Sequence, residues 1–226
     1  VGSEMCIRDR IDTAPDLITA HNHVMKKFGY PTKKLGELKN AVGKGAKAMM
    51  AKANGQWKWF DEKIQNEMTN EFLSYYGENI FHESKLINGV KEFLNWCKKE
   101  NISMAVCTNK TEHLAVDLLK KIGIYDYFEY VAGYNTFEYC KPDPRHLTTI
   151  IEILDGDINK SLMIGDSETD ANAAKAAEIP IILLKYGYTE KKSSEIYHNH
   201  LVKDFVDIEK IVTCLLYTSP SPRDSA

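Results

Sequence analysis

The chain has 226 residues, of which 43% are hydrophobic and 27% are charged, a balance that is typical of a globular protein and excludes a disordered one. Its formal net charge of −3 speaks against nucleic acid or an anionic membrane as a partner, and no apolar run approaches the ~20 residues that a membrane-spanning helix needs. The five cysteines are scattered and include no C-x-x-C pair, which argues against a disulfide framework or a zinc knuckle and favours a reducing, cytoplasmic location.

The two ends of the chain differ from the rest in composition. Residues 1–10 (VGSEMCIRDR) have no clear hydrophobic period, and residues 214–226 (CLLYTSPSPRDSA) place Ser, Pro and Asp after a short apolar stretch. Both resemble translated adapter sequence, so neither contributes to the expected fold. We expect residues 1–10 to be a non-native or disordered leader and residues 214–226 a non-native or disordered tail. Native but poorly ordered termini are the alternative.

Roughly the first eighty residues are predicted to be helical, with no strand. Apolar side chains recur at helical spacing from Thr13 to Gly29, and this glycine predicts a C-terminal stop. A second helical pattern covers residues 35–50 and is interrupted by Gly43 and Gly45. A third pattern, rich in aromatic residues, covers residues 57–76. Together these patterns predict a block of helices near the N-terminus.

After Gly89 the sequence alternates between helical and strand-like segments. Strands that alternate with helices of about ten residues are typical of β-α-β units in a parallel sheet. The sequence therefore predicts an α/β fold: a Rossmann-like parallel sheet flanked by helices, with a small helical domain inserted near the N-terminus. The expected helices are residues 90–100, 112–122, 144–154 and 168–177, and the expected strands are residues 102–107, 130–132, 161–165 and 179–184.

Polar residues occur where ligands bind in parallel sheets, beyond the carboxyl ends of the strands. Thr108 and Asn109 end the first clear strand, and a hydroxyl with neighbouring backbone amides can hold phosphoryl oxygens. Lys141 lies in a loop that two prolines stiffen. Asp166 ends another strand and Asp170 lies in the first turn of the next helix, so both carboxylates can face one pocket and suit Mg²⁺.

Each of these groups also has a purely structural interpretation. Thr-Asn after a strand is most often a turn or a helix cap, and a lysine before prolines is most often a solvated loop charge. The two aspartates could complement a helix dipole, which contributes only about a few tenths of a kcal/mol. The order of the groups, each after a strand, favours a functional site over these alternatives.

In this order the residues resemble the motifs of the haloacid dehalogenase (HAD) superfamily of phosphohydrolases. Thr108 matches the second motif, Lys141 the third, and Asp166 with Asp170 the fourth, G-D-x-x-x-D. Residues 11–17 (IDTAPDL) resemble the end of the first motif, which in the family reads D-x-D-G-T-L-x-D-[ST]-A-P-D-L. The resemblance implies a core of residues 11–13 and 83–213 and a helical cap domain of residues 14–82, inserted just after the first motif.

The mechanism of the superfamily implies a role for each matching residue. An aspartate attacks phosphorus to give an aspartyl-phosphate, and a second aspartate two residues later acts as acid and then as base. Thr108 would bond a phosphoryl oxygen and Lys141 would neutralise the nucleophile and the phosphate. Mg²⁺ would bind Asp166 directly, with Asp170 supporting the same metal site. Substrate contacts are expected from Asp12, Gly43, Lys44, Gly45 and Asn109.

The sequence departs from the superfamily at the start of the first motif. Counted back from Asp12, the nucleophile position holds Met5 and the acid/base position holds Ile7. Neither side chain can attack phosphorus or transfer a proton. We therefore expect this chain to lack phosphatase activity, whereas a parent sequence with the complete motif would be competent.

The cap sequence indicates a substrate. Residues 42–46 (VGKGA) are similar to the G-x-G-A signature of phosphoglycolate phosphatases, and Lys44 is suited to meet a small carboxylate such as that of 2-phosphoglycolate. A capped HAD phosphatase for a sugar phosphate or pyrophosphate is one alternative, and a non-catalytic pseudoenzyme that binds a phosphorylated ligand is another. The expected partner is a small phosphorylated metabolite, with no nucleic acid and no membrane, and we expect a monomer or a homodimer.

Overall fold

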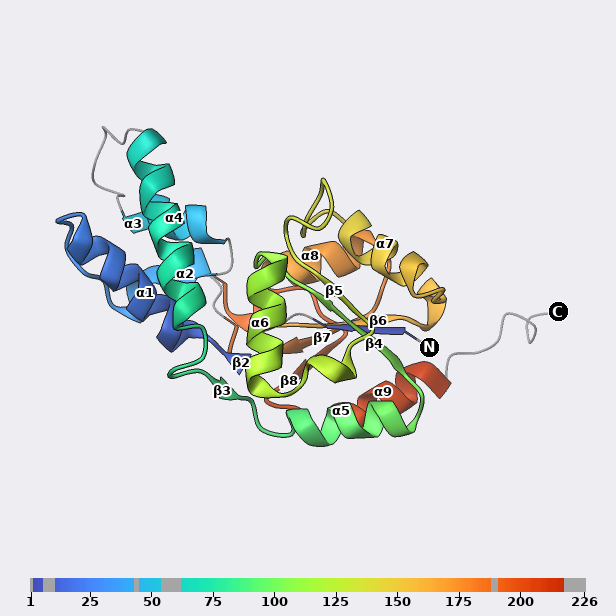
Figure 1. The fold of residues 1–226 in the computed structure, drawn as a ribbon. Helices are drawn as coiled ribbons and strands as arrows, with labels where there is room; N and C mark the ends of the chain where they lie inside the picture. Colours follow the sequence, from blue (N-terminus) through green and yellow to red (C-terminus); the bar gives the residue numbers. More distant parts are fainter. Residues whose placement is uncertain (1, 6–10, 43–44, 54–61, 188–190, 218–226) are drawn as a thin grey trace.

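The computed structural model describes residues 2–5, 11–42, 45–53, 62–187 and 191–217. Its core is a six-stranded sheet in which every pair of neighbouring strands is parallel (Figure 1). This confirms the predicted α/β fold with a parallel sheet. From one edge to the other the strands are β5 (Tyr130–Ala132), β4 (Ser103–Cys107), β1 (Gly2–Met5), β6 (Leu162–Gly165), β7 (Ile181–Leu184) and β8 (His200–Val202).

Strand β1 lies inside the sheet, between β4 and β6. Two expectations are wrong here: the first eighty residues do contain strands, and Gly2–Met5 do not form a disordered leader. The four residues GSEM show no period of two, so the pattern gave no strand signal; pairing with a strand on each side defines the strand instead. Residues 1 and 6–10 lie outside the described residues. That the leader is non-native stays a prediction.

Alternate residues of β4, β6 and β7 belong to two hydrophobic clusters. In β4, Met104 and Val106 belong to one cluster, and Ala105 and Cys107 to the other. The first cluster includes α5 (Val90–Lys99), α6 (Glu112–Ile122) and α9 (Ile208–Tyr217), and the second includes α7 (Arg145–Ile153) and α8 (Glu168–Ala176) (Figure 1). Because both faces of the sheet are covered, β4, β6 and β7 are largely apolar runs without polar alternation.

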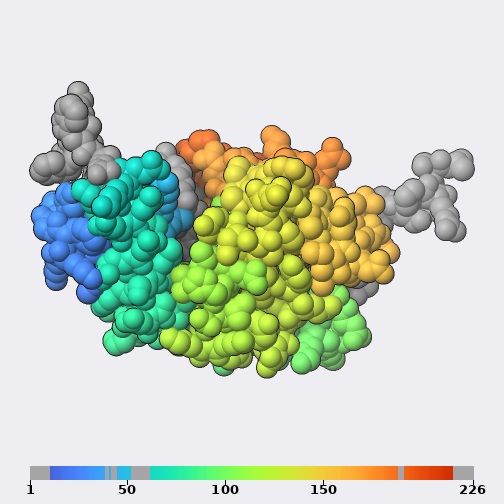
Figure 2. Space-filling model, turned by 45° about the horizontal axis from the view of Figure 1, so that its top comes forward, coloured from blue at the N-terminus to red at the C-terminus, as the bar shows by residue number. Residues whose placement is uncertain are grey.

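Four helices form a separate group at one end of the molecule (Figure 1, Figure 2). They are α1 (Ala14–Lys27), α2 (Leu35–Val42), α3 (Ala46–Ala53) and α4 (Glu62–Glu78). Helix α4 packs against both α1 and α3, and the buried side chains of the group include Met25, Met68 and Phe72. We refer to residues 14–82 as the cap. The chain enters it through β2 (Ile11–Asp12) and leaves near β3 (Lys85–Leu86), and these two short strands pair antiparallel.

A buried carboxylate joins the two segments that connect the cap to the core. Asp16, in the first turn of α1, accepts hydrogen bonds from the backbone N–H groups of His82 (3.1 Å), Glu83 (2.8 Å) and Ser84 (3.0 Å). It also accepts a short hydrogen bond from the Ser84 hydroxyl. The entry and the exit of the cap are therefore held side by side by one side chain.

The elements predicted after Gly89 are confirmed, with ends that shift by at most two residues. The sequence missed β3, β8 and α9, and the expected tail from residue 214 begins inside α9. The third helical pattern becomes α4, while residues 57–61 and 218–226 lie outside the described residues. Short 3-10 helices cover Tyr125–Tyr127, Ile158–Lys160 and Ser193–Glu195.

The helices of the described residues are too short or too polar to span a bilayer. The cap boundaries at residues 14 and 82, the cytoplasmic location and the oligomeric state stay predictions.

Candidate functional site

The predicted site residues lie at the carboxyl ends of neighbouring strands. Thr108 directly follows β4, Asp166 directly follows β6, and Met5 ends β1 between them. Met5 pairs with Val106 and Ile164, which precede Thr108 and Asp166 by two residues. Position 5 therefore lies at the same edge of the sheet as the residues predicted to bind phosphate and metal.

Backbone contacts fix the Thr108 side chain. Its N–H donates to the carbonyl oxygen of Ala132 in β5 at 2.9 Å, so the pairing of β4 with β5 continues to this residue. Its Oγ1 accepts a hydrogen bond from the N–H of Lys110 at 3.1 Å. A hydroxyl has one donor and two acceptor positions, so this contact leaves its proton able to bond another acceptor. The geometry suits a phosphoryl oxygen as that acceptor.

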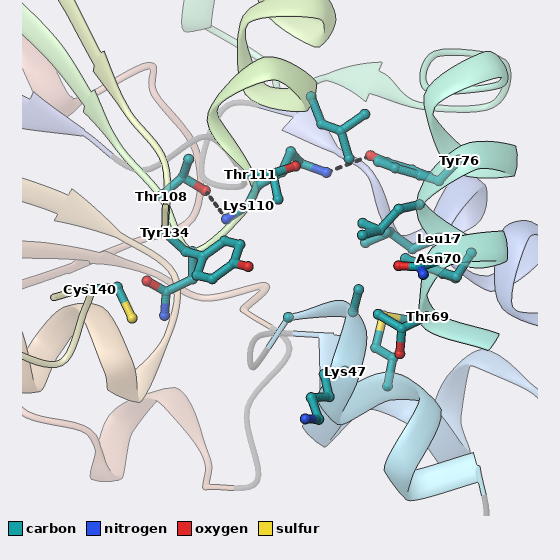
Figure 3. A pocket seen from close by; sticks show the side chains of 17 residues that line it. Leu17, Lys47, Thr69, Asn70, Tyr76, Thr108, Lys110, Thr111, Tyr134 and Cys140 are labelled. Atoms are coloured by element: carbon teal, nitrogen blue, oxygen red, sulfur yellow. Dashed lines mark hydrogen bonds between the residues drawn. The ribbon is translucent and has the colours of Figure 1, made fainter. Parts of the chain in front are cut away.

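A cavity of about 380 Å³ lies between the cap and the core, with Thr108 in its wall (Figure 3). Most of the surface that lines the cavity is apolar, with polar groups interspersed, which is typical of small-molecule sites. The core contributes the loop after β4, the start of α6 and the segment that includes Tyr134 and Cys140. The cap contributes residues of α1, α3 and α4, among them Leu17, Lys47, Phe72 and Tyr76.

The structure places the predicted substrate-binding residues in different surroundings. Asn109 and Gly45 both line the cavity. Residues 43–44, including the lysine expected to meet a carboxylate, lie outside the described residues. Asp12 lies in β2, where its Oδ1 accepts a hydrogen bond from the N–H of Ala14 at 3.2 Å, and it is not among the described residues that line the cavity. Its contact is that of a residue at the start of helix α1.

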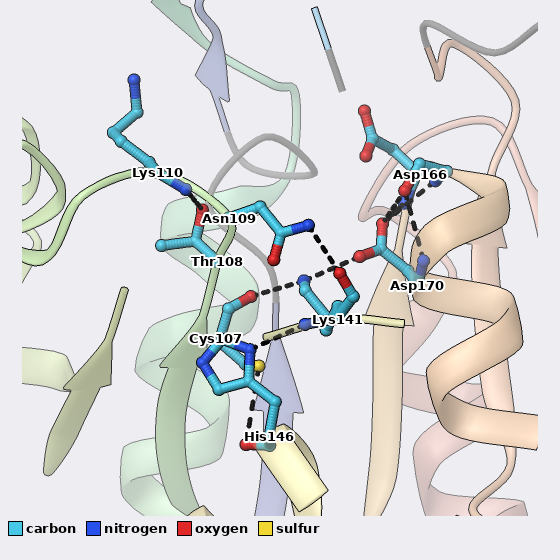
Figure 4. A network of polar contacts seen from close by, with 9 residues as sticks. Cys107, Thr108, Asn109, Lys110, Lys141, His146, Asp166 and Asp170 are labelled. Carbon is cyan, nitrogen blue, oxygen red and sulfur yellow. Dashed lines mark hydrogen bonds and ion pairs between the residues drawn. The ribbon is translucent and has the colours of Figure 1, made fainter. Parts of the chain in front are cut away.

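Lys141 is buried in a network of polar contacts (Figure 4). Its Nζ donates to Asp170 Oδ1 at 2.7 Å and to the Cys107 carbonyl oxygen at 2.6 Å. Its backbone N–H donates to His146 Nδ1 at 3.1 Å, and its carbonyl oxygen accepts from Asn109 Nδ2 at 2.9 Å. These contacts bring one positive charge to the ends of β4 and β6.

Asp170 connects Lys141 to the loop after β6. Its Oδ2 accepts hydrogen bonds from the N–H of Asp166 (3.1 Å), the N–H of Ser167 (3.1 Å) and the Ser167 hydroxyl (2.7 Å), and Ser167 caps helix α8 in return. A Cβ on Gly165 would lie 2.6 Å from the Cβ of Asp170. The glycine therefore gives Asp170 the space to reach back over the loop, which is a physical reason for the G-D-x-x-x-D spacing.

His146 is a site residue that the sequence analysis missed. It is fully buried at the start of α7, and its carbonyl oxygen lies 3.8 Å from the Cys107 Sγ. Burial, with a further contribution from the nearby Lys141 ammonium, lowers the pKa of His146 from 6.5 to about 4. The ring is therefore neutral at pH 7 and can accept the hydrogen bond from the Lys141 N–H. In the sequence, only its position five residues after Lys141 could have indicated that His146 lies near the site.

The donor set for Mg²⁺ is incomplete at this edge of the sheet. Asp166 brings a carboxylate to the end of β6, but both carboxylate oxygens of Asp170 accept hydrogen bonds from protein donors. Within the residues that the structure describes, no three His, Cys, Asp or Glu side chains are grouped to hold a metal ion. Methionine at position 5 has only a soft thioether, which does not suit Mg²⁺. The residues present do not fit Mg²⁺, and a carboxylate at position 5 would supply the missing ligand.

Known proteins resemble the chain along most of its length. The family model of haloacid dehalogenase-like hydrolases matches residues 11–184. A phosphoglycolate phosphatase from Mesorhizobium japonicum is 35% identical over 196 residues, which cover 86% of each chain. Another from Agrobacterium fabrum is 34% identical over 209 residues, or 90% of each chain. The crystal structure of a predicted phosphoglycolate phosphatase from Haemophilus somnus superimposes with a TM-score of 0.87 at 26% identity, covering 92% of this chain and 96% of that one.

Proposed function

Because the chain belongs to the haloacid dehalogenase-like hydrolase family, we propose that its site is that of a phosphomonoester hydrolase whose first catalytic motif is missing. The observation that carries this proposal is the buried Lys141–Asp170 ion pair at the same sheet edge as the Thr108 hydroxyl. A cation and a hydroxyl donor together suit a phosphoryl group, whose transfer depends mainly on positioning and charge stabilisation. The substrate class is a small phosphorylated metabolite.

In a chain with aspartates at positions 5 and 7, hydrolysis proceeds by two displacements at phosphorus. A carboxylate oxygen of the residue at position 5 forms a bond to phosphorus as the bond to the leaving oxygen breaks, and the acid at position 7 gives that oxygen its proton. The carboxylate at position 7 then takes a proton from water, which attacks phosphorus as the bond from phosphorus to the carboxylate at position 5 breaks, and phosphate is released. Thr108 donates to a phosphoryl oxygen, and Lys141 offsets the charge of the group in transfer.

Magnesium binding also depends on a carboxylate at position 5. Asp166 and a carboxylate at position 5 would hold the ion, which supplies further charge stabilisation when bound. Asp170 would position Lys141 and the loop after β6, since its oxygens accept hydrogen bonds from those groups.

The chain itself carries Met5 and Ile7 at these positions. A thioether cannot form the phosphorylated intermediate and an aliphatic side chain cannot transfer a proton, so we propose that this chain does not turn over. The two segments that would hold phosphate contact each other: Asn109 Nδ2 donates to the Lys141 carbonyl oxygen, and Lys141 Nζ donates to the Cys107 carbonyl oxygen. This favours a second candidate function, which is binding of a phosphorylated ligand without hydrolysis.

For the chain with a complete first motif, the substrate that we propose is 2-phosphoglycolate. The names of the relatives from Mesorhizobium japonicum and Agrobacterium fabrum support it, as does the VGKGA segment at residues 42–46. Lys44 would meet the substrate carboxylate as the cap closes and excludes water. A sugar phosphate or pyrophosphate is the alternative and would use the same phosphoryl site with other contacts to the cap.

A substrate panel on a restored chain tests this proposal. The restored chain carries Met5→Asp, Ile7→Asp, Arg8→Gly, Asp9→Thr and Arg10→Leu. Phosphate release is measured with 2-phosphoglycolate, a hexose phosphate, pyrophosphate and p-nitrophenyl phosphate. We expect the highest kcat/KM with 2-phosphoglycolate. A higher value with the hexose phosphate or with pyrophosphate would overturn the substrate and leave the reaction class intact.

Lys44→Met in the restored chain tests the carboxylate contact separately. We expect the KM for 2-phosphoglycolate to rise more than the KM for p-nitrophenyl phosphate, which has no carboxylate. Equal changes for the two substrates would refute a role in substrate recognition. Lys91→Met, at an exposed position of α5, is the matched control and should change neither KM.

A further inference from the structure

One hydrogen bond crosses from the phosphate-site loop to the cap. Lys110 follows Asn109 in the loop after β4, and Tyr76 lies near the C-terminal end of the cap helix α4. The Nζ of Lys110 donates to the Tyr76 hydroxyl at 2.7 Å and lies 4.1 Å from the centroid of its ring. Tyr76 is 1% exposed and Lys110 is half-buried, so this contact is partly shielded from water. A charge-assisted hydrogen bond in such a place is stronger than one on an exposed surface.

The same lysine also contacts the residue expected to hold phosphate. Its backbone N–H donates to Thr108 Oγ1 at 3.1 Å, while its side chain extends across the wall of the cavity to Tyr76 (Figure 3). Lys110, Thr108 and Tyr76 all line the cavity between cap and core. A shift of Lys110 therefore changes the support of the Thr108 hydroxyl and the position of α4 together.

The cap approaches the core closely next to this contact. A Cβ on Gly77, the residue after Tyr76, would lie 3.3 Å from Leu114 Cδ2, so α4 and α6 nearly touch at that point. On the other side of the cavity, a Cβ on Gly45 would lie 3.9 Å from the carbonyl oxygen of Asn109. The described structure thus has the cap seated on the loop after β4 and on the start of α6.

We propose that Lys110 is a positioning residue that holds α4 of the cap over the phosphoryl site and couples that site to cap closure. This role goes beyond the proposed function. It rests on that function in one respect, which is that closure of the cap excludes water and completes the substrate contacts. Lys110 acts in it through Tyr76 and Thr108, with no contact of its own to the reacting atoms.

The chain contains a reporter for cap opening. Cys140 lines the cavity and is partly exposed, whereas Cys107 is fully buried under the sheet edge and Cys214 is exposed on α9. The rate at which a bulky maleimide labels Cys140, read by mass spectrometry of the peptides, therefore reports how often the cap leaves the core. Cys107 reports whether the core stays folded, and Cys214 gives the reagent's intrinsic rate.

The experiment compares the unmodified chain with Lys110→Met, Tyr76→Phe, their combination and Lys110→Arg. Lys110→Met and Tyr76→Phe should each speed the labelling of Cys140 by about tenfold, the factor that corresponds to about 1.4 kcal/mol for one hydrogen bond to a charged group. The double variant should label no faster than the faster single variant, because both remove the same contact. Lys110→Arg keeps a cationic donor and should stay near the unmodified rate. Lys120→Met removes a comparable lysine–tyrosine contact within the core, over Tyr125, and should change nothing.

The proposal is overturned if Cys140 labels at an unchanged rate in both single variants while Cys107 stays protected, or if the two effects simply add. If Lys110→Met unfolds the core and exposes Cys107, the decision rests on Tyr76→Phe, which removes only one hydroxyl. Inorganic phosphate should slow the labelling of Cys140 in the unmodified chain and have less effect in Lys110→Met. No phosphate effect in the unmodified chain, with the other rates as expected, would count against the proposed phosphoryl site and leave the role of Lys110 supported.

Discussion

The Nζ of Lys141 lies 2.7 Å from Oδ1 of Asp170, and both side chains are 2% exposed. The pair joins the loop before α7 to the first turn of α8 at the edge of the sheet where β1, β4 and β6 end. Burial of a lysine is costly without a counter-charge, and the carboxylate of Asp170 offsets that cost for Lys141. The pair therefore keeps a positive charge at the phosphoryl site, although position 5 holds a methionine in place of the nucleophile.

Asp170→Asn should destabilise the protein strongly. The substitution keeps the shape of the side chain but leaves the Lys141 ammonium buried without its partner, at a cost of about 3–5 kcal/mol. Urea unfolding measures the change in the free energy of unfolding. Asp207→Asn, which breaks the exposed contact with Lys210, is the matched control and should cost less than about 1 kcal/mol. Equal losses in the two variants would show that the Lys141–Asp170 pair contributes no more than a surface pair.

Acid should destabilise the fold through His146. Its pKa is lowered from 6.5 to about 4 in the folded protein, so between these values the unfolded chain binds more protons. The stability that this neutral ring contributes is present above pH 6.5 and is lost as the pH falls toward 4, and it amounts to roughly 3 kcal/mol.

His146→Asn tests this pH dependence, because an amide can still accept the hydrogen bond from the Lys141 N–H but does not titrate. The free energy of unfolding is measured at pH 8 and pH 5 for both proteins. The variant should be less stable at pH 8 and should lose less stability than the parent on acidification. An equal loss in both proteins would assign the acid sensitivity to other groups.

Asp16→Asn should loosen the junction between cap and core. The substitution places an amide NH₂ among the N–H donors of His82, Glu83 and Ser84 and removes the negative charge that they share, at a cost of about 2–3 kcal/mol. Hydrogen exchange at residues 82–84 should become faster before exchange in the sheet does. Asp126→Asn, at an exposed position, serves as the control. Unchanged exchange at residues 82–84 would contradict the role given to Asp16.

Gly165→Ala should disturb the site although the added group is small. The new Cβ would lie 2.6 Å from the Cβ of Asp170, so the aspartate must move away from Lys141 or the strand must shift. We expect a loss of about 2 kcal/mol or more in the free energy of unfolding. Gly36→Ala is the matched control, since its Cβ would meet no atom within 4 Å, and in helix α2 it should stabilise by about 0.5–1 kcal/mol. An unchanged free energy of unfolding in Gly165→Ala would refute the steric conflict with Asp170.

The elements with strong local signals were the ones predictable from sequence. Helix α6 has apolar residues at helical spacing and ends at Gly123, which adopts the left-handed conformation with φ of 74°, so both its existence and its end follow from local chemistry. Strand β1 has no such signal, because its place depends on pairing with β4 and β6, far away in the sequence. Helix α9 was missed because its apolar face runs into a segment with the composition of a tail.

The placement of Thr108 and Asp166 at one edge of the sheet was predictable, because each directly follows a strand. Their roles in binding phosphate and metal stay predictions. Roles that depend on three-dimensional contacts were not predictable. Nothing in the sequence shows that both carboxylate oxygens of Asp170 accept hydrogen bonds from protein donors. Nor does it show that His146 accepts a hydrogen bond from the Lys141 N–H, or that Lys110 donates one to Tyr76. Conversely, the expected substrate contact of Asp12 rested on its motif alone, and the structure gives its side chain a contact at the start of α1.

The absence of a nucleophile from an otherwise retained phosphoryl site can be tested by measuring phosphate release from 2-phosphoglycolate, with and without Mg²⁺, by the unmodified and the restored chain. The restored chain carries the five substitutions at positions 5 and 7–10 described above, and circular dichroism confirms that both proteins are folded. We expect release only from the restored chain and only with Mg²⁺, because the unmodified chain retains the phosphoryl site without a nucleophile. Release above the blank from the unmodified chain would contradict this account, and so would a folded restored chain that hydrolyses none of the phosphate esters in the panel.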